Sequence, residues 1–105
     1  MWFVFPQLKG LGRSWMAAEY SIASRLEAEE YVKHSILGSR LIDCTRLVIA
    51  IEGRSIEHIF GSIDAKKFRS SMTLFSAIAG ANPIFSDALH KYFGGQPDQL
   101  TLDRL

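Results

Sequence analysis

Apolar residues recur every three to four positions along most of this chain, and glycine, proline, asparagine and serine interrupt them at short intervals. This spacing is typical of amphipathic helices, and only the ambiguous segment 2–5 resembles a strand. The pattern therefore predicts an all-α fold, a compact single-domain bundle of about five to six short helices. The candidate helical stretches, of which the first and last are only one or two turns long, are 15–22, 25–34, 36–52, 56–60, 65–79, 83–93 and 99–102.

Small polar residues precede most of these segments, as expected of side chains that cap the free N–H groups of a helix. Ser24 is followed three positions later by Glu27, which matches the capping box. Asn82 and Pro83 fit a cap followed by the first helical residue. The predicted N-caps are Ser14, Ser24, Ser55, Asp64, Asn82 and Asp98.

The segment 36–52 carries the widest apolar arc, so we expect it to be the central and mostly buried helix. The arc comprises Leu37, Leu41, Cys44, Leu47, Val48 and Ile51. Arg40 falls within this arc on a helical wheel. Because an unpaired buried guanidinium is very costly, we expect Arg40 to pair with Asp64 or Asp98, to contact an anion, or to reach past the helix end.

Two polar residues intrude on the apolar stripe of the segment 65–79. The stripe comprises Phe68, Met72, Phe75 and Ile78. Ser71 falls inside it and Lys67 at its edge. Either Ser71 is a small residue that lets helices pack closely, with its hydroxyl bonded to the preceding turn, or it holds a small anion together with Lys67. A third reading is a Ser–Lys nucleophile pair, which needs Ser71 to be exposed to a concave pocket.

The chain opens with "MWFVFPQLKGLGRS", in which a short apolar run lacks a basic flank and is interrupted by Pro6. These features argue against a signal peptide, and no apolar run reaches membrane-spanning length. We expect residues 1–13 to form an extended segment and a glycine-rich turn against one helical domain at 14–105. The glycines either serve a turn and a cap, or leave N–H groups for a phosphate beside Arg13.

Charge and composition exclude several classes of function. Twelve Lys and Arg against eleven Asp and Glu give a formal net charge of +1, which argues against nucleic-acid and membrane partners. The single cysteine, Cys44, has no disulfide partner in the chain, so we expect a cytoplasmic protein. The histidines lack metal-ligand spacing, and no GxSxG or HExxH motif occurs. We therefore expect no metal, no cofactor and no catalytic residue.

Four strings, taken together, resemble a known family: "WFVFPQLKGLGRS", "LGSRL", "RSSMTLF" and "YFGGQPD". The chain resembles the small bacterial family catalogued as domain of unknown function 1810, whose members are sometimes labelled calpastatin. The resemblance implies a small all-helical fold and no established activity. Members carry a further helix before the first string, so the resemblance implies that this chain lacks that helix. We then expect Trp2, Phe3 and Phe5 to be core residues whose cover is partly absent.

The intruding polar residues and the aromatic start support two functional hypotheses. The first is a non-enzymatic binding module for an anionic, phosphate- or nucleotide-like small molecule. Its cationic pocket comprises Gln7, Arg13, Ser14, Arg40, Lys67 and Ser71. The alternative is a protein-interaction or self-association domain. It docks through Trp2, Phe3, Phe5 and Trp15.

Overall fold

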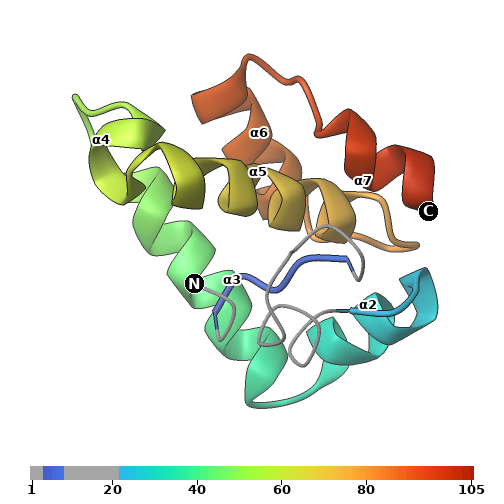
Figure 1. Ribbon diagram of the computed structural model, residues 1–105. Coiled ribbons are helices and arrows are strands. Elements are labelled where there is room, and N and C mark those ends of the chain that lie inside the picture. Colours follow the sequence, from blue (N-terminus) through green and yellow to red (C-terminus); the bar gives the residue numbers. More distant parts are fainter. Residues whose placement is uncertain (1–3, 9–21) are drawn as a thin grey trace.

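The computed structural model describes residues 4–8 and 22–105, and every regular element in this part of the chain is a helix (Figure 1). The helices are α2 (Arg25–Lys33), α3 (Leu37–Ala50), α4 (Ile56–Phe60), α5 (Ser62–Ser76), α6 (Pro83–Phe93) and α7 (Gln99–Arg104). The predicted all-α class is confirmed. Of the helix predicted at 15–22, all but Ile22 lies outside the described residues.

Helix α5 is the centre around which the others pack. It contacts α2, α4, α6 and α7, and it crosses the middle of the molecule in Figure 1. Its buried residues include Phe68 and every position from Ser70 to Phe75. The predicted apolar stripe of the segment is buried throughout: Phe68, Met72, Phe75 and Ile78. The central helix is therefore α5 and not the segment 36–52.

Aromatic rings fill the core on both halves of α5. The rings around Phe68 belong to Phe5, Phe60 and Phe93, with centroids 4.9, 5.4 and 6.4 Å away. The rings around Phe75 belong to Phe85 and Tyr31, at 5.5 and 5.7 Å. Such pairs add stabilisation beyond the apolar area they bury. They join the N-terminal segment, α2, α4 and α6 to the central helix.

Helix α3 is amphipathic rather than mostly buried, which corrects the expectation from its apolar arc. Its buried positions are Gly38, Leu41, Thr45 and Val48. Leu47 is 68% exposed, and Arg40 is exposed as well. The buried residues of α3 follow one another at intervals of three, four and three positions, which places them on one face of the helix. It includes a glycine and a threonine, which a count of apolar residues leaves out.

Segment 4–8 lies buried without forming a regular element. Phe5 and Leu8 belong to the core, so the expectation that Phe5 is a core residue is confirmed. The chain returns beside this segment at Ile22, whose N–H donates to the Gln7 carbonyl at 2.7 Å. Leu8 and Ile22 form an isolated parallel bridge. Ile22 is therefore not the end of a helix, as predicted, but a partner of the N-terminal segment.

Four predicted N-caps are confirmed. The side chains of Ser24, Ser55, Asn82 and Asp98 accept hydrogen bonds from the first turns of α2, α4, α6 and α7. The cap predicted at Asp64 is wrong, because α5 begins earlier, after Gly61 with its φ of 84°. Asp64 lies in the first turn, where the helix dipole also favours a carboxylate. Because a carboxylate is favoured both at the N-cap and in the first turn, the sequence alone does not distinguish these two positions.

Helix α6 caps the C-terminus of α3 with two adjacent side chains. The Lys91 ammonium donates to the carbonyls of Ile49 and Ile51. The Tyr92 hydroxyl donates to the carbonyl of Val48. The last carbonyls of a helix have no partner within it, so these contacts satisfy acceptors that α3 leaves open. They fix α3 against α6.

Among the described residues, no helix is both long and apolar enough to span a bilayer.

Candidate functional site

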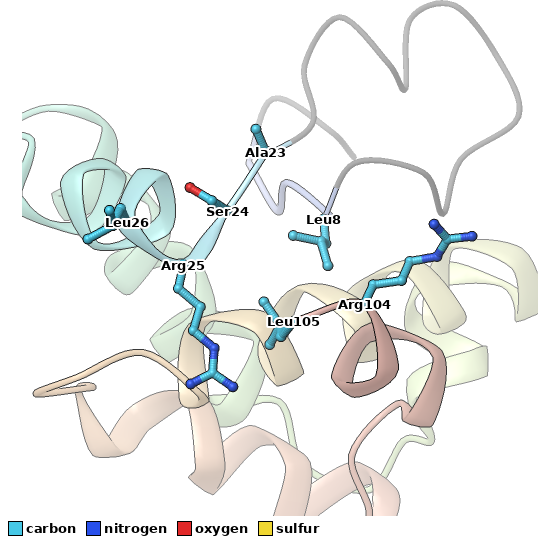
Figure 2. A pocket seen from close by; sticks show the side chains of 7 residues that line it. All are labelled: Leu8, Ala23, Ser24, Arg25, Leu26, Arg104 and Leu105. Atoms are coloured by element: carbon cyan, nitrogen blue, oxygen red, sulfur yellow. The ribbon is translucent and has the colours of Figure 1, made fainter.

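A surface cavity of about 380 Å³ lies where three segments distant in sequence meet (Figure 2). The N-terminal segment contributes Leu8, the start of α2 contributes residues 23–26, and the end of α7 contributes residues 104 and 105. The bridge between Leu8 and Ile22 brings the first two segments together. Helix α7 is carried to the same place by its packing on α5.

The cavity combines an apolar surface with two cations. Its leucines are Leu8, Leu26 and Leu105. In Figure 2, Leu105 lies between Arg25 and Arg104, which extend from α2 and α7 along opposite sides. No described carboxylate forms an ion pair with either guanidinium. The arrangement offers positive charge next to apolar surface.

Two N–H groups around the start of α2 are already bonded within the chain. The Ser24 hydroxyl accepts from the Glu27 N–H at 3.2 Å, and the Glu27 carboxylate accepts from the Ala23 N–H at 3.0 Å. These bonds occupy two of the N–H groups around the helix start, where an anion could otherwise bind. Arg25 and Arg104 supply the full positive charges beside the cavity.

No pattern in the sequence predicts this cavity. Arg25 and Arg104 lie 79 positions apart, and nothing in the pattern of α2 or α7 joins them. Leu26 lies on the face of α2 opposite Ala28 and Val32, at 100° per residue, and it is 72% exposed. Single exposed apolar side chains are common on protein surfaces, so Leu26 gave no signal of the cavity.

Gln7 and Ser71, which the sequence singled out, are both buried, with 7% and 0% of their surfaces exposed. The Gln7 Oε1 and the Ser71 Oγ find no hydrogen-bond partner among the described residues. The expectation that the Ser71 hydroxyl bonds to the preceding turn is therefore wrong. Ser71 is also closed to solvent, so the condition for a Ser–Lys nucleophile pair is not met.

The two cations expected beside Ser71 occupy different surroundings. Lys67 lies 3.8 Å from Asp64 on α5, and its side chain is partly buried. Arg40 is exposed on α3 and hydrogen-bonds the Tyr31 hydroxyl on α2. Burial raises the pKa of Tyr31, while the hydrogen bond and the charge of Arg40 act in the opposite direction. The expectation of a buried Arg40 guanidinium is therefore wrong.

Asp98, named as a candidate partner of Arg40, instead serves α5 and α7. Its carboxylate accepts from the Ser70 hydroxyl at 3.3 Å and from the Thr101 hydroxyl at 2.6 Å. Arg69 donates to the carbonyls of Gln96 and Pro97. These contacts join the strings "RSSMTLF" and "YFGGQPD" to each other, so their polar residues stabilise the fold.

The remaining predicted residues divide by location. Arg13, Ser14, Trp2, Phe3 and Trp15 lie outside the described residues. Phe5 lies against Phe68 with 5% of its surface exposed, so it is no docking side chain, contrary to the interaction hypothesis. No cluster of three or more His, Cys, Asp or Glu suited to a metal occurs in residues 4–8 and 22–105.

Comparisons with known proteins agree with this fold. The model of the family described as Protein of unknown function (DUF1810) matches residues 1–105. The chain is similar to the solved structure of the conserved hypothetical protein Rv1873 from Mycobacterium tuberculosis, with 52% sequence identity and a TM-score of 0.96. That match covers 99% of this chain and 74% of the other. No curated protein matches.

Proposed function

Because this chain belongs to the DUF1810 family, whose description assigns no activity, we propose a function from its own geometry: it is a binding module for a small anionic molecule that also carries an apolar part. The observation that carries this proposal is the cavity beside Leu8, which is lined by Arg25, Arg104 and three leucines. We place the module in the cytoplasm, since Cys44 is its single cysteine.

The chemistry of the cavity selects the ligand class. Arginine recognises carboxylate and phosphate groups in a planar, two-pronged geometry, and both arginines are exposed, so their long side chains are able to turn toward a bound anion. The leucines offer apolar surface but no hydrogen bonds. A ligand pocket of this type holds a few oriented polar groups within a mainly apolar wall. An aryl or nucleoside phosphate has both parts.

The test is a thermal melting series with four probes: phenyl phosphate, phenol, inorganic phosphate and AMP. We expect phenyl phosphate and AMP to raise the Tm saturably, because a ligand that binds only the native state stabilises it by mass action. At about 100 times the Kd the gain is about 2.7 kcal/mol. Phenol and inorganic phosphate each carry one half of the required chemistry, so they should act weakly.

Three variants locate the binding. The double variant Arg25→Gln/Arg104→Gln should abolish the response and leave the Tm without ligand nearly unchanged, since both side chains are exposed. Arg46→Gln is the matched control, because Arg46 is an exposed arginine paired with Asp43 on α3. If Lys67→Gln alone removes the response, binding belongs to α5, the location first expected from the sequence. A flat series with every probe refutes the proposal.

A further inference from the structure

The geometry points to a second, internal site, in which Gln7 and Ser71 together hold one ordered water molecule between the N-terminal segment and α5. This inference does not depend on the proposed function. It begins with two buried polar atoms, the Gln7 Oε1 and the Ser71 Oγ, that lack partners among the described residues. Buried polar groups in native proteins are nearly always hydrogen-bonded, so each of these atoms calls for a partner.

Ser71 differs from the other hydroxyl residues around it on α5. The hydroxyls of Ser70, Thr73 and Ser76 each donate to a carbonyl of their own helix, those of Lys66, Arg69 and Thr73. The Ser71 hydroxyl makes no such bond. A serine in a helix usually satisfies itself on the preceding turn or turns to another partner. The Ser71 hydroxyl is therefore available to a group outside α5.

The packing of α5 shows which group Ser71 faces. Ser71 shares a helix face with Phe68, one turn before it, and with Phe75, one turn after it. Phe68 contacts Phe5 of the N-terminal segment, and Phe75 contacts Tyr31 of α2. Ser71 accordingly faces the region between the N-terminal segment and α2.

Gln7 lies in that same region. It comes two positions after Phe5, and both side chains are buried. Its carbonyl accepts from the N–H of Ile22, just before α2 begins. Figure 1 shows the segment running in the same direction as α5, and Phe5 contacts Phe68. Gln7 follows Phe5 by two positions and Ser71 follows Phe68 by three, so this shared direction supports our inference that Gln7 lies near the turn that contains Ser71.

A water molecule fits the two groups better than a direct bond or an ion. The two atoms do not bond to each other, and a single water molecule between them would give each a partner. Water donates to an amide oxygen and either donates to or accepts from a hydroxyl. An ion between two neutral groups in an apolar setting lacks a counter-charge, which makes it far more costly.

The test combines a crystal structure with a double-mutant cycle in thermal melting. We expect electron density for a water molecule within about 3.2 Å of both atoms. Ser71→Ala and Gln7→Met should each lower the Tm by about 4–8 °C. The double variant should lower the Tm by clearly less than the sum of the two single losses. Once either substitution has removed the water bridge, the second substitution has no bridge left to break.

Ser76→Ala is the matched control for the cycle. The Ser76 hydroxyl is bonded to the Thr73 carbonyl, so its loss should add to that of Gln7→Met without coupling. The crystal structure needs no substitution, and it decides the matter even if Gln7→Met fails to fold. An additive cycle for Gln7 and Ser71, or density in which the two atoms have separate partners, overturns the inference.

Discussion

The backbone N–H of Asp98 donates a hydrogen bond to the Thr73 hydroxyl at 2.8 Å, across 25 positions of sequence. The same Thr73 hydroxyl donates to the Arg69 carbonyl of its own helix. Asp98 in turn caps α7 by accepting from the Thr101 N–H at 3.1 Å. One pair of residues thereby links the last turn of the central helix to the start of α7.

Asp98→Ala should destabilise the protein by about 2–4 kcal/mol, because it removes an N-cap and two side-chain hydrogen bonds together. Urea unfolding measures the change. Asp103→Ala is the matched control on the same helix, since Asp103 is exposed and, among the described residues, accepts from the Gln99 amide alone. Equal losses in the two variants would show that the Asp98 contacts contribute nothing.

The junction of α3 and α6 provides a second test. Tyr92→Phe removes the hydroxyl that donates to the Val48 carbonyl, so we expect a loss of about 1 kcal/mol. Combining it with Lys91→Met should cost more, because the carbonyls of Ile49 and Ile51 then also lose their donor. Thermal melting reports both changes.

Lys66→Met serves as the control for the Lys91 substitution. Lys66 is exposed on α5, so the loss of its charge should change the Tm little. If Lys91→Met and Lys66→Met behave alike, the Lys91 ammonium does not cap α3 in solution.

Gly38 marks a close approach of α3 to α2. A Cβ atom at this position would lie 1.8 Å from the carbonyl oxygen of Val32 on α2, a distance that no side chain tolerates without backbone movement. Gly38→Ala should therefore destabilise the fold by about 3 kcal/mol or more. Ser39→Ala, at the exposed neighbouring position, should be neutral or slightly stabilising because alanine favours helix. Similar unfolding curves for the two would contradict the close packing.

The same glycine explains why the sequence predicted the elements well but the packing face of α3 poorly. With Leu37 at 0° and 100° per residue, the buried positions of α3 centre near about 60°. Leu47 and Arg40 lie at about 280° and 300°, on the far side. An apolar count gives no weight to Gly38 or Thr45, so it shifts the expected face toward Leu47. A cap residue, by contrast, bonds to the first turn of the helix that follows it, so it can be recognised from the local sequence.

The candidate site was less predictable than the fold because it depends on tertiary placement. The cavity needs Leu8, the start of α2 and the end of α7 to meet, and no local pattern encodes that meeting. Ser71 was recognisable as a polar residue on an apolar face, and it is buried there. Helical periodicity does not predict the partner of the Ser71 hydroxyl, because that partner depends on which other segment, such as the one with Gln7, packs against α5.

Tyr31 supports a prediction about alkaline pH. Its hydroxyl is half-buried between α2 and α3, and burial raises its pKa above the usual value of 10.0, against the opposing effect of Arg40. The unfolded chain therefore loses this proton at a lower pH than the native protein does. The contribution of neutral Tyr31 to stability is complete below pH 10 and is lost as the pH rises through the native pKa.

Tyr31→Phe should accordingly flatten the alkaline fall of the Tm, because phenylalanine has no proton to release. The measurement is a series of melting curves between about pH 8 and pH 11 for both proteins, since tyrosine ionises near pH 10. Arg40→Met should steepen the fall, because it removes a group that favours the ionised hydroxyl. Parallel curves for the original protein and Tyr31→Phe would show that Tyr31 ionises as readily in the native state as in the unfolded chain.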